Sequence, residues 1–370
     1  MTAKLNHNVR IPVTLVTGFL GSGKTTFINK ALHALELSKT VVVVNEFGEV
    51  GLDHSLFASS NDSVIVLKNG CLCCTVKSDL VSTLNELYHD RHAGRIPYFD
   101  NVVIETSGLA EPSPVLQAFL SEPTLDGLFR VVSVVTLVDA VNWEKTTEKH
   151  DEALRQVALA DRILITKLDL VEGEKEAALS NELSRLSPAA YIQAVDWDTA
   201  KIAKLLKSDG FDNADPSANP LPWLNILAHR QQDTSKGDPH FHLYEKGIES
   251  FVLLRDNPLS REELQFLLDG ISQNLGTSLL RVKGLVNVAE EPGRPAVIQG
   301  AQHLLHTMTW LEAWPDSDQR TRVVFITQGI VREKLKEIIE LLDRMSDRTF
   351  KARERGRLAR EAAEKGAEVA

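Results

Sequence analysis

Apolar residues in the first 200 positions gather into short runs that are separated by longer, partly polar stretches. Most runs are unbroken series of Val, Ile and Leu, which are typical of strands buried on both faces. Their alternation with helical stretches predicts βαβ units and a mostly parallel sheet in an α/β fold. The expected strands are residues 12–17, 40–45, 64–67, 102–105, 131–138 and 162–166. The expected helices are residues 25–37, 77–92, 114–120, 151–159 and 174–186.

The pattern changes after residue 207. Residues 208–246 are rich in Asp, Asn, Pro, Ser, Gln and His, which predicts a polar linker. Beyond it, strands expected at 248–254, 279–288, 295–299, 304–310 and 323–327 are accompanied by only two helices, at 260–270 and 331–345. This order predicts a small α+β domain. The chain therefore divides into a nucleotide-binding domain at 1–207, the linker, a C-terminal domain at 247–345, and a charged helical tail at 346–370.

A phosphate-binding loop is the strongest motif. Residues 18–25 (GFLGSGKT) lie between an expected strand and an expected helix, as the pattern G-x-x-x-x-G-K-[ST] requires. Backbone N–H groups of such a loop and the helix N-terminus bind phosphate. Lys24 is expected to reach the β- and γ-phosphates, and the Thr25 hydroxyl to bind Mg²⁺. The expected nucleotide-binding residues of the loop are Gly18, Gly21, Ser22, Gly23, Lys24, Thr25 and Thr26.

A second motif indicates which base is bound. Residues 166–169 (TKLD) follow the expected strand 162–166, at the end where ligands bind in open α/β sheets. The Asp169 carboxylate can accept hydrogen bonds from guanine N1–H and the exocyclic amine, which adenine lacks. Lys167 is expected to lay its stem over the base. The common GTPase signature begins with Asn where this chain has Thr166, and a solvated loop is the alternative interpretation.

Two further segments suit a γ-phosphate and Mg²⁺. Residues 102–108 (VVIETSG) have the form of a Walker B strand, so that Glu105 would hold Mg²⁺ through a water and Gly108 would offer its N–H to the γ-phosphate. Residues 45–53 (NEFGEVGLD) are typical of a switch loop, or of a solvated acidic loop. The expected catalytic residues are Lys24, Thr25, Glu105 and Glu49, while Glu46 and Asp53 are alternatives for orienting the hydrolytic water.

The three cysteines of the chain all lie in residues 71–74 (CLCC). Clustered thiolates favour a borderline or soft metal ion such as Zn²⁺ over a disulfide framework, and three protein ligands leave a fourth position open. We expect Cys71, Cys73 and Cys74 to bind the metal. Redox chemistry and inert packing are the alternatives. Further candidate ligands are Glu49, Asp53, His240 and His242.

Charge and composition exclude some partners. The net charge is −10, which argues against nucleic acid as a partner. No apolar run approaches the roughly 18 residues of a membrane span, and no apolar signal-peptide core follows Met1. Apolar and charged contents of 43% and 25% are ordinary for a globular protein. The expected location is the cytoplasm.

Taken together, the motifs at residues 18–26, 45–53, 70–74, 105–112 and 160–169 resemble those of the CobW/YjiA-type GTPases. That family is similar to the nickel-insertion GTPases of urease and hydrogenase maturation. The resemblance implies a GTPase that uses GTP and Mg²⁺, binds Zn²⁺ through the C-x-C-C motif, and passes the metal to a client metalloprotein. Relatives also serve cobalamin synthesis and metalloenzyme activation, so the resemblance does not identify the client or the metal. A homo-oligomer is possible as well.

Two departures from the resemblance matter for the metal. Some relatives carry a glutamate before the N-E-F-G motif where this chain has Val44, and many have a long histidine-rich linker where this chain has only His240 and His242. Bulk metal storage is therefore disfavoured. The rival functions are a small-molecule kinase and a metal-sensing or storage module that binds nucleotide without turnover.

Overall fold

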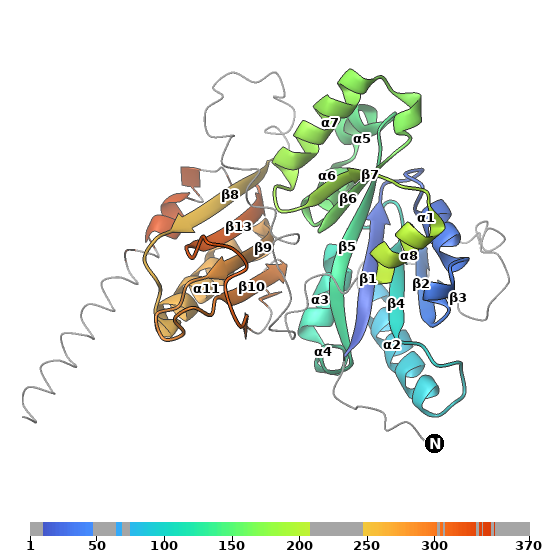
Figure 1. Cartoon of the computed structure of the whole chain (residues 1–370), viewed down its shortest axis with the longest axis horizontal. Coiled ribbons are helices and arrows are strands. Elements are labelled where there is room, and N and C mark those ends of the chain that lie inside the picture. The colour runs from blue at the N-terminus through green and yellow to red at the C-terminus, as the bar shows by residue number, and fades with distance from the viewer. Residues whose placement is uncertain are drawn as a thin grey trace, which may run out of the picture. The chain divides into compact units, whose positions relative to one another are not determined.

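The computed structural model describes residues 10–46, 64–68, 75–207, 247–301, 304–305, 308–330, 333–334, 336–341 and 344. The expected linker at 208–246 and the expected tail at 346–370 lie outside these residues. Within them the chain divides between Ile248 and Glu249 into two compact units, which are described separately (Figure 1). None of the helices in these ranges is both long and apolar enough to cross a membrane.

The first unit is built on a seven-stranded sheet in the order β3-β2-β4-β1-β5-β6-β7 (Figure 1). All of its strand pairs are parallel, which confirms the α/β prediction. Its strands are β1 Ile11–Gly18, β2 Thr40–Glu46, β3 Val64–Lys68, β4 Asn101–Thr106, β5 Phe129–Asp139, β6 Arg162–Thr166 and β7 Tyr191–Ala194. The sequence did not predict β7, because it is a short edge strand with partly exposed side chains and no apolar run.

The helices of this unit connect the parallel strands. They are α1 Lys24–Leu32, α2 Thr75–His92, α3 Ser113–Ser121, α4 Pro123–Leu128, α5 Trp143–Lys149, α6 Asp151–Ala158, α7 Gly173–Leu186 and α8 Thr199–Lys207. The expected helix 25–37 was too long: α1 ends at Leu32, and Ala34 is extended before a 3₁₀ turn at Leu35–Leu37. The chain has to reverse there, because β2 begins at Thr40. α1 and α8 pack together against Val16 and Val135 of the sheet.

The second unit is a six-stranded sheet in the order β11-β10-β9-β13-β8, with β12 also paired to β10. Its strands are β8 Ile248–Arg255, β9 Leu279–Val286, β10 Ala296–Ala301, β11 Leu304–Leu305, β12 Thr309–Trp310 and β13 Thr321–Gln328. The single strand expected at 304–310 is two strands. Both pair antiparallel with β10: Gly300 lies three positions after its neighbour in the ladder, Val297, whereas their partners Leu305 and Thr309 lie four positions apart.

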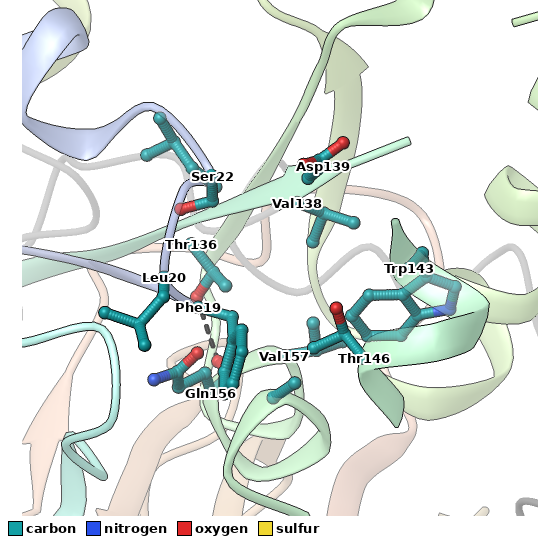
Figure 2. Close-up of a pocket in the computed structure, with 12 residues that line it drawn as sticks. Phe19, Leu20, Ser22, Thr136, Val138, Asp139, Trp143, Thr146, Gln156 and Val157 are labelled. Atoms are coloured by element: carbon teal, nitrogen blue, oxygen red, sulfur yellow. Dashed lines mark hydrogen bonds between the residues drawn. The ribbon is translucent and has the colours of Figure 1, made fainter. Parts of the chain in front are cut away.

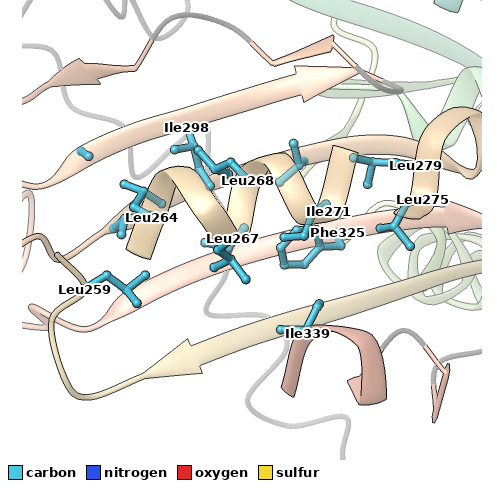
Figure 3. Packing of buried hydrophobic residues seen from close by; sticks show 14 of the residues in the cluster. Leu259, Leu264, Leu267, Leu268, Ile271, Leu275, Leu279, Ile298, Phe325 and Ile339 are labelled. Atoms are coloured by element: carbon cyan, nitrogen blue, oxygen red, sulfur yellow. The ribbon is translucent and has the colours of Figure 1, made fainter. Parts of the chain in front are cut away.

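Helix α11, Arg261–Leu275, covers one face of this sheet (Figure 3). Leu264, Leu268 and Ile271 of the helix pack with Ile298 and Phe325 of the strands. The sequence predicted that the helix would end at Gly270. It continues because Ile271 and Leu275 extend the buried stripe, and it ends at Gly276, whose φ is 52°.

The start of α11 generates a prediction about stability. The Ser260 hydroxyl accepts a hydrogen bond from the Glu263 N–H at 3.2 Å, and the Glu263 carboxylate accepts one from the Ser260 N–H at 2.7 Å. Loss of such a cap typically costs about 1 kcal/mol. Ser260→Ala should therefore lower the free energy of unfolding by about that amount in urea denaturation. Ser82→Ala, at an exposed position inside α2, is the control and should change it by less than about 0.5 kcal/mol.

Candidate nucleotide-binding site

The loops that follow β1, β4, β5 and β6 meet at one edge of the first sheet. β1 lies between β4 and β5, and β5 pairs with β6, so the carboxyl ends of the four strands are neighbours. The buried hydroxyl of Thr106, at the end of β4, donates a hydrogen bond to the Thr17 hydroxyl of β1 at 2.8 Å. This edge brings together the expected phosphate, magnesium and base-binding residues that the structure describes.

The phosphate loop has a backbone that depends on glycine. Gly18, Gly21 and Gly23 have φ angles of 139°, 74° and 96°. A Cβ at Gly18 would lie 2.4 Å from the Leu137 carbonyl oxygen, so a side chain is also excluded by contact. Gly23 is the N-cap of α1, which places the loop at a helix N-terminus. This arrangement suits an anion such as a nucleotide phosphate.

Lys24 and Thr25, the last two residues of the phosphate loop, both make polar contacts. The ammonium of Lys24, a residue only 7% exposed, donates hydrogen bonds to the carbonyls of Gly18 at 2.8 Å and Phe19 at 3.2 Å. The Thr25 hydroxyl donates one to Glu105 Oε1 at 2.8 Å. Glu105 is only 5% exposed. A hydroxyl and a buried carboxylate thus meet from two different elements, and such oxygen ligands fit Mg²⁺. Thr26 lies on the exposed side of α1.

The segment after β4 touches the phosphate loop. A Cβ at Gly108 would lie 2.7 Å from the Leu20 backbone nitrogen and 2.9 Å from the Leu20 Cα. Glycine is therefore the only residue type at position 108 that allows the two backbones to come this close. The Ala110 N–H bonds the Ser107 carbonyl at 3.0 Å, so the chain turns immediately after the contact.

Thr166 joins the base motif to the phosphate loop. Its hydroxyl, in a residue only 1% exposed, donates to the Ser22 carbonyl at 3.0 Å and to the Val138 carbonyl at 3.1 Å. The short side chain that stands in place of the usual Asn thus bonds both the phosphate loop and strand β5. Asp169 is exposed in the 3₁₀ turn Leu168–Leu170, which directly follows Lys167.

Lys167 adopts an unusual backbone conformation. Its φ of 59° is the only positive value of a non-glycine residue in the described part of the chain. The Lys167 ammonium forms an ion pair with Asp139 Oδ2 at 2.7 Å. The Asp139 carboxylate also accepts hydrogen bonds from the Val141 N–H at 2.9 Å and the Asn142 side chain at 2.8 Å. Asp139 thereby holds the residue that precedes Asp169 by two positions.

Asp139 was not predicted from the sequence. It is the last residue of β5, so the rule that selects acids at the end of buried strands would have found it beside Glu105 and Asp169. Burial raises the pKa of Asp139, but hydrogen bonds from Lys167, Asn142 and Val141 outweigh burial and lower it below the ordinary value of 3.8. The carboxylate is therefore charged at neutral pH.

A small hollow lies beside the loop, between the phosphate loop and helices α5 and α6 (Figure 2). Phe19, Leu20 and Ser22 line it from the loop, and Gln156 lines it from α6. Trp143 of α5 closes another side, and its indole N–H donates to Glu182 at 2.8 Å. Gln156 was also not predicted as a site residue, because nothing in a helical pattern distinguishes it.

The expected zinc ligands, unlike the magnesium ligands Thr25 and Glu105, are not among the described residues. Cys71, Cys73, Cys74, Glu49, Asp53, His240 and His242 all lie outside them. Within the described ranges no three His, Cys, Asp or Glu side chains gather closely enough to hold a metal ion.

Comparison with known proteins agrees with this geometry. The family model for the CobW/HypB/UreG nucleotide-binding domain matches residues 12–193, and the model for the cobalamin synthesis protein cobW C-terminal domain matches residues 248–342. The zinc chaperone YjiA of Escherichia coli is 32% identical over 88% of this chain and 96% of its own length. The zinc-regulated GTPase metalloprotein activator 1 of Schizosaccharomyces pombe is 31% identical over 87% of this chain and 83% of its own length.

A solved structure of a YjiA GTPase is also similar to this chain. The crystal structure of the Zn(II)-bound YjiA GTPase from E. coli covers 90% of this chain and 99% of its own, with a TM-score of 0.64 and 28% identity. The phosphate loop and the residues that meet it at this edge of the first sheet are those of a P-loop nucleotide-binding protein. The chain belongs to the CobW/HypB/UreG family and, within it, to the CobW/YjiA GTPases.

The Asp139–Lys167 ion pair generates a prediction with a pH dependence. Because the pKa of Asp139 is lowered in the folded protein, its stabilising effect is present above about pH 3.8 and is lost as the pH falls through the folded pKa. Asp139→Asn should therefore lower the free energy of unfolding by about 1 kcal/mol at pH 7. The difference from wild type should shrink in urea denaturation as the pH falls below about 3.8 and through the lowered pKa of Asp139.

The matched control is Asp256→Asn, whose carboxylate is 86% exposed and 3.7 Å from Arg320. It should change the stability at pH 7 by less than about 0.5 kcal/mol. An Asp139→Asn protein as stable as wild type at pH 7 would contradict a role for this ion pair in holding Lys167.

Proposed function

We propose that this protein is a GTP-hydrolysing metallochaperone that binds Zn²⁺ through Cys71, Cys73 and Cys74 and transfers it to a client metalloprotein as the nucleotide state changes. The observation that carries the nucleotide part is the meeting of the phosphate loop, Glu105 and the Thr166–Asp169 motif at one sheet edge. The names of the relatives, two of which are zinc chaperones or zinc-regulated activators, support the metal part.

The phosphates of GTP would bind along the glycine loop. Lys24 now donates to two loop carbonyls, and the same ammonium would turn to the β- and γ-phosphates. Thr25 and Glu105 would hold Mg²⁺, which when bound neutralises charge on those phosphates. The Gly108 N–H would bind the γ-phosphate, because its backbone already lies against Leu20 of the loop. These contacts place and orient the group that is transferred to water.

The guanine base would lie at the turn after β6. The Asp169 carboxylate would accept from N1–H and the exocyclic amine, and Lys167 would cover the ring. The ion pair with Asp139 supports this role, because it fixes Lys167 before the base arrives.

Zinc would bind where the chain has its only thiols. Residues 71–74 directly precede α2 and follow β3 in the chain, between the two segments expected to respond to the γ-phosphate. Three thiolates suit Zn²⁺ and leave one position for water, an acidic side chain such as Glu49 or Asp53, or a ligand from the client. A different physiological metal is the alternative.

The first prediction of this proposal concerns the base. Asp169→Asn should weaken GTP binding by roughly 2–4 kcal/mol, because an amide cannot accept both guanine hydrogen bonds. It should at the same time improve relative binding of xanthosine triphosphate, whose C2 carbonyl suits an amide donor. Calorimetric titration of both nucleotides measures this. Glu172→Gln, an exposed acid three positions later, removes the same charge and should leave both affinities unchanged. Equal affinity of the wild type for ATP and GTP would contradict the assignment.

The second prediction tests the function as a whole. One Zn²⁺ should bind per chain, and its affinity should differ between the GDP form and a form loaded with a non-hydrolysable GTP analogue. A useful switch requires a coupling of roughly 5–150-fold, and zinc should change the affinity for the analogue by the same factor. Competition titration with a chromogenic chelator measures both zinc affinities.

Two variants serve as controls for the zinc titration. The triple Cys71→Ser, Cys73→Ser, Cys74→Ser protein should lose the site, and the chain has no other cysteine to replace it. The double His240→Ala, His242→Ala protein tests the linker pair. Equal zinc affinity in both nucleotide forms would refute nucleotide-controlled transfer, and GTP turnover without any acceptor would exclude a small-molecule kinase.

A further inference from the structure

Gln156 of α6 binds the turn that follows β4. Its side-chain amide nitrogen donates hydrogen bonds to the Gly108 carbonyl at 3.1 Å and to the Ala110 carbonyl at 3.0 Å. The residue is only 1% exposed. Its own backbone carbonyl accepts a hydrogen bond from the Thr136 hydroxyl of β5 at 2.9 Å (Figure 2). Gln156 is therefore fixed to the sheet on one side and to the turn on the other.

The neighbouring residue of α6 holds the same turn. Arg155 forms an ion pair with Glu111, and both side chains are only partly exposed, at 27% and 30%. Two consecutive helical residues thus bind successive positions of the segment 108–111. This segment has no regular secondary structure, so its position depends on such contacts.

The turn is held from the opposite side by the phosphate loop. Gly108 approaches the Leu20 backbone so closely that a Cβ would lie 2.7 Å from the Leu20 nitrogen. Gln156 holds the carbonyl of Gly108 by a hydrogen bond, and the Leu20 backbone limits movement of the Gly108 Cα. Together these contacts restrain Gly108, and with it its N–H, beside the phosphate loop.

The chemistry of the contact requires an amide. One planar NH₂ group supplies two donors to two carbonyls. A glutamate of the same shape would place a carboxylate oxygen, which only accepts hydrogen bonds, against both carbonyls and would leave them unpaired in a buried place. A methionine would keep the volume and supply no donor.

We propose that Gln156 is a positioning residue for the γ-phosphate: it holds the 108–111 turn where the Gly108 N–H can bind that phosphate. This inference rests on the proposed function, in which GTP lies along the glycine loop. GDP has no γ-phosphate, so Gln156 matters for GTP binding and hydrolysis and not for GDP binding. A residue that only stabilises the fold would affect both nucleotides alike.

The test compares the full-length wild type with Gln156→Met and Gln156→Glu. Fluorescence titrations measure the affinities for GDP and for a non-hydrolysable GTP analogue, and phosphate release under single-turnover conditions measures hydrolysis. The expected result is an affinity for the analogue reduced about tenfold or more, the size expected for lost hydrogen bonds, with GDP affinity within about twofold of wild type and slower hydrolysis. The Gln156→Met protein, which buries no unpaired charge, keeps the test valid if Gln156→Glu does not fold.

Thr14→Val is the matched control. The Thr14 hydroxyl, in a fully buried residue, donates to the Leu206 carbonyl of α8 at 3.0 Å, so the variant loses the same kind of contact away from the nucleotide edge. It should leave the ratio of the GDP and analogue affinities unchanged.

The outcomes separate this inference from the proposed function. A wild type that binds and hydrolyses GTP, together with folded Gln156 variants of unchanged affinity ratio, overturns the role of Gln156 alone. Equal losses for GDP and the analogue also overturn it. A wild type that binds no guanine nucleotide overturns the proposed function and this inference with it.

Discussion

Parallel pairing of β1 with β4 and β5, and of β5 with β6, places the loops after these four strands at one edge of the sheet. Every described residue of the nucleotide site depends on this constraint. Lys24 and Thr25 follow β1, Glu105 lies in β4, and Asp139 ends β5. The positions of these side chains follow from the ordinary geometry of parallel strands. The strands, buried by their Val and Ile residues, supply rigid positions, and the chemistry is carried by the one or two residues where each strand ends.

Buried side chains hydrogen-bond the backbone carbonyls of the loops at this edge. They lack regular backbone pairing, so their carbonyls need other donors. Lys24 donates to two carbonyls within the phosphate loop, Thr166 to one carbonyl of that loop and one of β5, and Gln156 to two in the 108–111 turn. Each of these side chains is buried and each serves two acceptors. Hydrogen bonds from these buried side chains therefore fix the backbone of the loops, and a ligand meets loops that are already in place.

How much the sequence predicted depends on how local the signal is. The Val-rich strands, the phosphate loop, Glu105 and the base motif follow from short patterns, and the structure brings Thr25 and Glu105 together as expected. Gln156 could not be found this way, because its role depends on a partner 48 positions earlier in the chain. The end of α11 was missed for a related reason. Gly270 is a local stop signal, but burial of Ile271 and Leu275 outweighs it.

Thr166 shows why one departure from the common signature is compatible with the site. A β-branched residue suits the end of strand β6, and its hydroxyl lies one bond from the Cβ, so the donor stays close to the backbone. The single hydroxyl proton is shared between the Ser22 and Val138 carbonyls. Because one acceptor belongs to the phosphate loop and the other to strand β5, this side chain ties the start of the 166–169 motif to both. The base motif thus begins with a residue that is tied to the phosphate loop, and in the proposed function recognition of the base belongs to Lys167 and Asp169.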